Sequence, residues 1–175
     1  SEAILIIMAS SILEDKGQID LIKSFEMLLK ESKRIFLIIA GSSVKSSPES
    51  IKYEKKIFQY VKENNLNDSI RFIGWRHDIR NVLSKSDIYV STSYSESLPD
   101  AVREAMLVSL PVVVTNVGGT GELVNLEENG FLFEPGDQKS LTKYLKRLID
   151  NPSEREEMGL KSKAIIDNRF STKLY

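Results

Sequence analysis

The sequence predicts an α/β fold in which a doubly wound parallel sheet of about six strands carries helices on both faces. Short apolar runs alternate with longer amphipathic stretches along the chain. Several of these runs are apolar at consecutive positions, which is typical of strands buried on both faces of a parallel sheet. The repeated strand–helix order favours right-handed crossover connections between parallel strands.

The strand candidates are apolar runs rich in Ile, Val, Phe and Tyr, residue types that favour strands. They occupy residues 3–8, 34–41, 70–74, 87–93, 111–115 and 130–134. Helices are predicted at 18–32, 47–65 and 78–85, after Glu96, and at 120–126, 137–149 and 153–167. In the first of these, Ile19, Ile22 and Phe25 fall on one face. No repeat, low-complexity segment or linker interrupts this order, so we expect one domain over residues 1–175.

Composition narrows the class of protein. The chain of 175 residues, 41% apolar and 28% charged, is typical of a globular domain. The lack of cysteine excludes disulfides, thiolate zinc sites and cysteine nucleophiles, and a single histidine disfavours other transition-metal sites. A net charge of −1 gives no electrostatic footprint for nucleic acid. No run predicts a membrane span or a signal peptide, so we expect a soluble, cytoplasmic protein.

Ligands of open parallel sheets bind beyond the carboxyl ends of the strands, so the loops that follow the predicted strands are candidate sites. Lys16, beside Gly17 and just before a helix, can direct its ammonium group at an anion. Gly41 permits close approach of a ligand, and Trp75 and Arg76 can stack on a base or reach a phosphate. All of these residue types also occur in ordinary surface loops.

The segment after the fourth predicted strand favours an anion site at a helix start. Ser97 suits the N-cap, Pro99 suits the first turn, and Asp100 follows Ser97 at the spacing of a capping box. The free backbone N–H groups near Ser97, Leu98 and Pro99 would then bind a phosphate.

Two acids, Glu96 and Glu104, flank this predicted anion site. An acid beside a phosphate is repulsive unless it binds something else. Sugar hydroxyls are natural partners, because a carboxylate accepts two hydrogen bonds from a vicinal diol. The alternative interpretation makes Glu96 a solvent-exposed acid favoured by the helix dipole and Glu104 an ion-pair partner.

Other segments disfavour a dinucleotide-dependent enzyme and a catalytic histidine. Gly118, Gly119 and Glu122 follow the fifth strand and do not form a GxGxxG pattern, which disfavours a dinucleotide-dependent oxidoreductase. His77 has no nucleophile motif around it, so we expect a surface histidine without a catalytic role.

The stretch ESLPDAVREAMLVSLPVVVTNVGGTGELV resembles the donor-binding signature of the retaining family 4 glycosyltransferases, which have the GT-B architecture of two Rossmann-like domains. In that signature two glutamates are followed by Ala-Met, a Pro-Val-Val strand and Gly-Gly-x-x-Glu. The elements stand here at Glu96, Glu104, Ala105–Met106, Pro111–Val113 and Gly118–Glu122. The segments EDKG, LIIAGSS, IRFIGW and SDIYVSTSYSES are similar to the preceding family elements in the same order.

The resemblance implies a role for each of these residues. Glu96 would contact hydroxyls of the donor sugar, Glu104 would bind the ribose hydroxyls, and Lys16 would neutralise the departing diphosphate, so Glu96 and Lys16 are the catalytic candidates. The main chain around Gly74 and Trp75 would read the base.

The diphosphate would be held by the backbone at Ser97, Leu98 and Pro99. At position 11 the family commonly has an arginine that touches the diphosphate, where this chain has Ser11, and Arg76 is the candidate replacement. The family also often has glycine at position 97. The remaining donor-binding candidates are Gly17 and Gly41.

The sequence therefore predicts one half of a GT-B fold: the donor-binding domain of a retaining, metal-independent glycosyltransferase. Its substrate would be a UDP- or GDP-sugar, without a cofactor, and it would transfer a hexose to a glycan or lipid-linked acceptor in surface polysaccharide or lipopolysaccharide biosynthesis. The missing partner would be the N-terminal acceptor-binding domain of the same enzyme, so we expect donor binding with little or no transfer.

Two alternatives are a nucleotide-sugar epimerase of related architecture and a non-catalytic Rossmann-like binding module.

A further expectation concerns the membrane. Lys139, Lys143 and Lys146 share one face of a predicted amphipathic helix, which can place the protein peripherally at the inner face of the cell membrane. The alternative is a core-packed helix with a solvated basic back.

Overall fold

The computed structural model describes residues 3–32, 34–97 and 99–171 and confirms the predicted α/β fold. Within these residues the strands form one parallel sheet in the order β3-β2-β1-β4-β5-β6. The strands are β1 (Ile4–Ala9), β2 (Ile35–Ala40), β3 (Ile70–Gly74), β4 (Ile88–Ser91), β5 (Val112–Thr115) and β6 (Gly130–Phe133).

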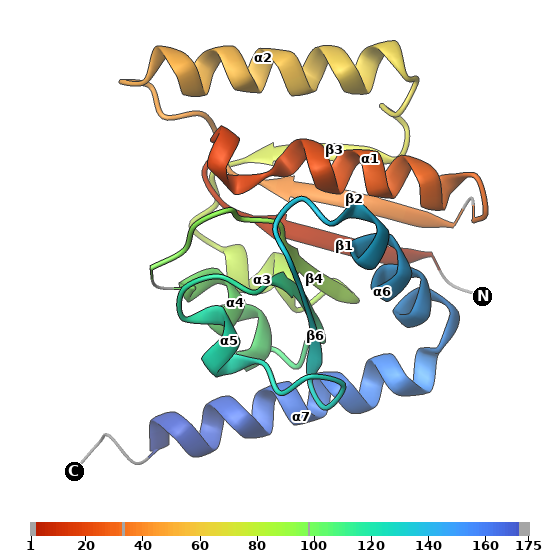
Figure 1. Ribbon diagram of the computed structural model, residues 1–175, viewed down its shortest axis with the longest axis vertical. Helices are drawn as coiled ribbons and strands as arrows, with labels where there is room; N and C mark the ends of the chain where they lie inside the picture. Colours follow the sequence, from red (N-terminus) through yellow and green to blue (C-terminus); the bar gives the residue numbers. More distant parts are fainter. Residues whose placement is uncertain (1–2, 33, 98, 172–175) are drawn as a thin grey trace.

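Helices follow the strands as expected (Figure 1). They are α1 (Gln18–Leu29), α2 (Pro48–Glu63), α3 (Ile79–Leu83), α4 (Asp100–Leu107), α5 (Thr120–Leu123), α6 (Gln138–Asp150) and α7 (Pro152–Ser171), with a short 3₁₀ turn η1 (Glu14–Lys16) before α1. In the described part of the chain, no helix is both long and apolar enough to cross a bilayer.

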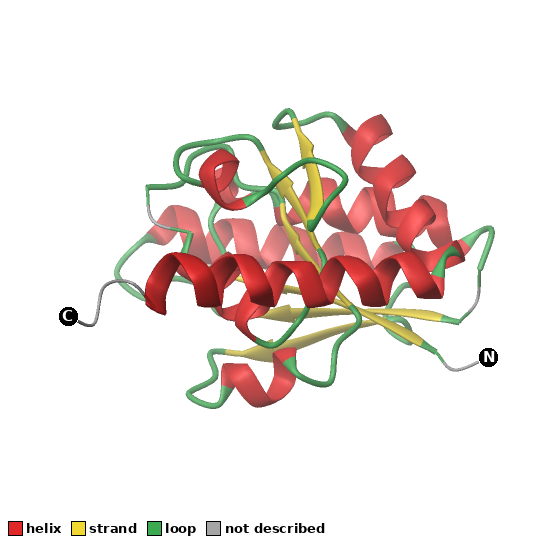
Figure 2. Cartoon of the chain, turned by 90° about the horizontal axis from the view of Figure 1, so that it is seen from below, coloured by secondary structure: helices red, strands yellow, loops and turns green. Residues whose placement is uncertain are grey.

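Two apolar cores, one on each face of the sheet, explain why the strands are apolar at consecutive positions. In β1, Ile6 and Met8 belong to the core under α1, α2 and α6, whereas Ile7 belongs to the core under α3, α4 and the end of α7. All three side chains are completely buried. Figure 2 shows the strands between these helical layers.

Helix α6 is packed into the core by Leu141, Leu145 and Leu148, as its apolar stripe predicts. The ammonium group of Lys146 on its outer side pairs with Glu31 and with Asp150. The basic face is therefore partly neutralised by neighbouring acids, and peripheral membrane contact stays a prediction.

The strand order reverses direction between β1 and β4. From β1 the chain adds β2 and β3 on one side, and from β4 it adds β5 and β6 on the other. Crossovers therefore leave the sheet in opposite directions, and a crevice opens beyond the carboxyl ends of β1 and β4. The loops after these two strands contain Lys16 and Glu96.

Candidate functional site

Two adjoining pockets lie at this crevice, and each contains one of the two glutamates. The Lys16 pocket, of about 170 Å³, is lined by residues that include Lys16 and Glu96. The Trp75 pocket, of about 190 Å³, is lined by residues that include Trp75 and Glu104. Residues 9–11 line both pockets and form a shared wall between them.

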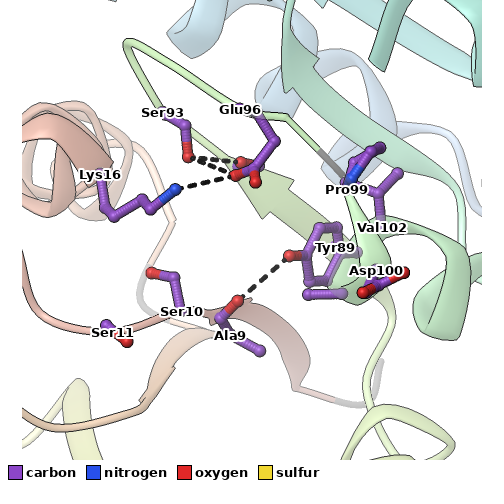
Figure 3. Close-up of a pocket in the computed structure, with 12 residues that line it drawn as sticks. Ala9, Ser10, Ser11, Lys16, Tyr89, Ser93, Glu96, Pro99, Asp100 and Val102 are labelled. Carbon is purple, nitrogen blue, oxygen red and sulfur yellow. Dashed lines mark hydrogen bonds and ion pairs between the residues drawn. The ribbon is translucent and has the colours of Figure 1, made fainter. Parts of the chain in front are cut away.

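Lys16 and Glu96 form an ion pair across the Lys16 pocket (Figure 3). The Lys16 Nζ lies 3.0 Å from the Glu96 Oε2 and 3.3 Å from the carbonyl oxygen of Ser95. Both side chains are largely but not fully buried, at 18% and 21% exposure. The two catalytic candidates, 80 positions apart in the chain, are therefore in direct contact.

The loops after β1 and β4 are also joined behind this pair. The Thr92 hydroxyl lies within hydrogen-bond distance of the carbonyl oxygens of Lys16 and Gly17, at 3.0 and 2.9 Å. The Ser93 hydroxyl contacts Glu96 Oε2 at 3.4 Å, and the Ser93 carbonyl accepts a hydrogen bond from the Thr115 hydroxyl at 2.7 Å. These residues are not among the predicted site residues. Their signal is a run of small hydroxylated residues, buried where β4 and β5 end.

The backbone of Gly118 packs directly against the backbone of Glu96. This contact is not among those predicted from the sequence. The φ of Gly118 is 50°, and a Cβ atom there would lie 1.6 Å from the carbonyl oxygen of Glu96. Any side chain at position 118 would therefore displace the backbone that carries Glu96.

The predicted capping box at Ser97 is wrong. Helix α4 begins at Asp100, its N-cap is Pro99, and no side chain caps it. The observed N-cap thus lies two positions after Ser97, and Pro99, predicted in the first turn, precedes the helix instead. Leu98 lies outside the described residues. Pro99 and the first turn of α4 nevertheless line the Lys16 pocket, so the positive end of the helix dipole faces it.

Glu104 lines the Trp75 pocket and lies 3.6 Å from the Nε of Arg80 on α3. The alternative interpretation of Glu104 as an ion-pair partner is thus confirmed in part. Arg80 is mostly exposed, and such surface pairs contribute little to stability. Glu104 therefore remains able to exchange this partner for a ligand hydroxyl.

Trp75 is 63% exposed, and its ring meets the exposed His77 ring edge-to-face at 4.0 Å. Arg76 lines the Trp75 pocket but not the Lys16 pocket, and both of its hydrogen bonds go to the Asp78 carboxylate at 2.8 Å. This pairing raises the pKa of Arg76 and lowers the pKa of Asp78. Arg76 lines the Trp75 pocket together with Ser11, so its role as a replacement for an arginine at position 11 stays a prediction.

The remaining candidates line the shared wall or support it. Ser11 is exposed and lines both pockets. Gly41 lines the Trp75 pocket and packs against the shared wall, since a Cβ atom there would lie 1.8 Å from the carbonyl oxygen of Ser10. The Gly41 N–H donates to the carbonyl oxygen of Gly74 at 2.8 Å, which ties the end of β3 to the same edge.

The floor of the Lys16 pocket includes Tyr89, which the sequence analysis also missed. Its hydroxyl donates to the carbonyl oxygen of Ala9 at 3.4 Å, and burial raises its pKa. Within the described residues no three His, Cys, Asp or Glu side chains are grouped to hold a metal ion.

Comparison with known proteins places this geometry in a family. The model for "Glycosyl transferases group 1" matches residues 1–164. The chain is 38% identical over 94 residues to the Escherichia coli UDP-Gal:alpha-D-GlcNAc-diphosphoundecaprenol alpha-1,3-galactosyltransferase, covering 54% of this chain and 24% of that one. It is 27% identical over 163 residues to the capsular polysaccharide biosynthesis glycosyltransferase CapM of Staphylococcus aureus, covering 93% and 41%.

The crystal structure of Anabaena HepE in complex with UDP and glucose superposes with a TM-score of 0.89 at 26% identity, over 97% of this chain and 45% of that chain. The chain thus spans less than half the length of each of these three proteins. Since the family model covers nearly all of the sequence, the chain belongs to the glycosyl transferases group 1 family.

Proposed function

We propose that this chain is the donor-binding half of a retaining glycosyltransferase that transfers a hexose from a nucleoside diphosphate sugar. The observation that carries the proposal is the separation of Glu96 and Glu104 into two pockets with one shared wall. A nucleotide sugar has two hydroxyl-rich ends joined by a diphosphate, which matches two acids on either side of a wall. The UDP-bound neighbour supports this choice of ligand.

In the proposed complex the nucleoside lies in the Trp75 pocket. Glu104 accepts hydrogen bonds from the ribose hydroxyls, and the exposed face of Trp75 stacks on the base or ribose. The diphosphate crosses the shared wall toward Lys16 and the start of α4, and the sugar lies beside Glu96.

The Lys16–Glu96 ion pair exchanges partners when the donor binds. The diphosphate takes the Lys16 ammonium, and Glu96 is then free to accept hydrogen bonds from the sugar hydroxyls. As the glycosidic bond breaks, negative charge grows on the diphosphate. Lys16 and the first turn of α4 stabilise this charge without a metal ion or cofactor.

The acceptor would bind to a second domain. Because the chain spans less than half of its relatives, we propose that an N-terminal acceptor-binding domain of the same enzyme completes the cleft. A glycan or lipid-linked acceptor is supported by the names of the relatives, which include a diphosphoundecaprenol galactosyltransferase and a capsular polysaccharide enzyme. A role in surface polysaccharide or lipopolysaccharide biosynthesis follows.

Titration of this chain with UDP, GDP, ADP and CMP, followed by amide NMR without metal, tests the proposal. We expect saturable shifts with UDP or GDP that are lost in Glu104→Ala and kept in Glu63→Ala, a control at the end of α2 outside both pockets. Shifts that survive Glu104→Ala would contradict the proposed nucleoside site. In a protein that includes both domains, sugar transfer to an acceptor, rather than isomerisation, separates a transferase from an epimerase.

A further inference from the structure

Gln18, the first residue of α1, is completely buried although its side chain is polar. Its Nε2 donates to the carbonyl oxygen of Ser11 at 2.8 Å and to the hydroxyl oxygen of Ser10 at 3.1 Å. Ser10 and Ser11 belong to the wall that the two pockets share. The buried Gln18 side chain therefore fixes the position of this wall through hydrogen bonds from the protein interior.

The orientation of the Gln18 amide follows from its partners. A backbone carbonyl can only accept a hydrogen bond, so the NH₂ end of the amide must face Ser11. The second N–H of that group goes to the Ser10 oxygen, which therefore acts as an acceptor. The Ser10 proton must then point elsewhere. In the described part of the chain it has no protein acceptor.

Packing does not account for the glutamine. The Gln18 Oε1 is buried and has no hydrogen-bond partner among the described residues. A buried polar atom without a partner is unfavourable, and an apolar side chain of similar size would avoid that cost. The amide thus stands, despite this cost, at the position that orients the wall.

We infer that the Ser10 hydroxyl, oriented by Gln18, donates a hydrogen bond to a diphosphate oxygen of the bound nucleotide. The inference rests on the proposed donor site. A diphosphate that joins the two pockets must pass the wall, and its oxygens only accept hydrogen bonds. Among the described residues that line the Lys16 pocket, Lys16 is the one Lys or Arg, and Ser11 supplies no positive charge, so neutral donors gain importance. Figure 3 shows Ser10 facing the Lys16–Glu96 pair.

The test compares the dissociation constants of UDP and uridine by calorimetry. We expect Ser10→Ala to weaken UDP binding about tenfold, the effect of a lost hydrogen bond to a charged group, and to leave uridine binding unchanged. Ser42→Ala is the matched control, since Ser42 is exposed at the same sheet edge and lines neither pocket.

Gln18 is a positioning residue and is tested through Ser10. Gln18→Met keeps the volume but cannot donate hydrogen bonds. It should weaken UDP binding severalfold in the native background and much less in the Ser10→Ala background, with no such coupling for uridine. Losses that add, or that appear equally for uridine, would show a purely structural role and overturn the positioning claim.

The remaining outcomes separate the two proposals. If the native chain binds UDP and Ser10→Ala binds it equally well, the Ser10 inference is wrong and the donor site stands. If Ser10→Ala weakens UDP and uridine alike, the hydroxyl does not act on the diphosphate, and the inference is again overturned. If the native chain binds no nucleoside diphosphate, the proposed function fails and the inference falls with it.

Discussion

The two edges of the sheet differ in a way that locates function. A larger groove, about 990 Å³, lies at the amino ends of the strands and is lined by residues that include Leu5, Asp87 and Arg155. Two of its charged side chains already have backbone partners: Asp87 accepts the Leu5 N–H at 2.7 Å, and Arg155 donates to the carbonyl oxygen of Leu148. The pockets at the carboxyl edge are several times smaller, yet one of them contains the partly exposed Lys16–Glu96 ion pair.

The physical reason is the direction of the backbone. In a parallel sheet with right-handed crossovers, helices start at the carboxyl edge and end at the amino edge. Free N–H groups and the positive ends of helix dipoles therefore gather at the carboxyl edge, where they favour anions, whereas carbonyl groups gather at the other edge. Volume alone would select the wrong edge for an anionic ligand.

Gly118→Ala should have the largest effect, because a Cβ atom would overlap the carbonyl oxygen of Glu96 and displace the Glu96 loop. We expect UDP binding to weaken more than about 100-fold and unfolding free energy to fall by about 2 kcal/mol. Gly121→Ala is the matched control, since the nearest atom there is the movable Asn116 side chain. Calorimetry and urea unfolding measure the two quantities. Native-like UDP binding by Gly118→Ala would show that this loop is not part of the site.

Lys16→Met should weaken UDP binding about 10- to 100-fold, because it removes charge-assisted hydrogen bonds and leaves Glu96 unneutralised. Lys85→Met changes a lysine that lines the larger groove at the amino edge and should leave the dissociation constant of UDP unchanged. This pair of variants compares the two edges directly. A greater loss for Lys85→Met than for Lys16→Met would reverse our assignment of the binding edge.

Glu96→Gln should strengthen UDP binding by about threefold, since Lys16 no longer has a competing carboxylate and the diphosphate loses a repulsive neighbour. UDP-sugar binding should not gain equally, because Glu96 is proposed to accept hydrogen bonds from the sugar. Glu156→Gln, at the amino edge, is the control. Weaker UDP binding by Glu96→Gln, measured by calorimetry, would rule out the proposed exchange of partners.

The smallest expected effect concerns stability at high pH. It arises from residues that lie at neither of the two edges compared above. A hydrogen bond from the Tyr60 hydroxyl to Glu26 raises the pKa of Tyr60 to about 12, and burial adds to the shift. A raised pKa favours the protonated folded form, so this stabilisation is complete below about pH 10 and is lost as the pH rises toward 12. The free energy of unfolding, measured with urea at pH 9 and at pH 12, should fall less between these two pH values in Tyr60→Phe than in the native chain. The difference should be less than about 1 kcal/mol. An unchanged pH profile would assign the loss to other groups.

The sequence by itself determined the elements and the candidate loops. The apolar runs and amphipathic periods predicted the strands and α-helices of the described residues near their observed positions, because burial on one or two faces imposes a local pattern that can be read without the fold. The same pattern, with the rule that ligands lie beyond the carboxyl ends, singled out Lys16, Glu96, Glu104 and Trp75.

Only the tertiary structure decided how these residues meet. The pairing of Lys16 with Glu96 depends on β1 and β4 being neighbours in the sheet. The contact of Gly118 with the Glu96 backbone depends in the same way on β4 and β5 being neighbours. No local period encodes such contacts between loops that are distant in the chain. The capping pattern at Ser97 rests on residue types alone, and the helix starts two positions later than that pattern places it, after Pro99. The role of Gln18 became visible only once its burial was known, because a glutamine at a helix start looks like an ordinary exposed residue in the sequence.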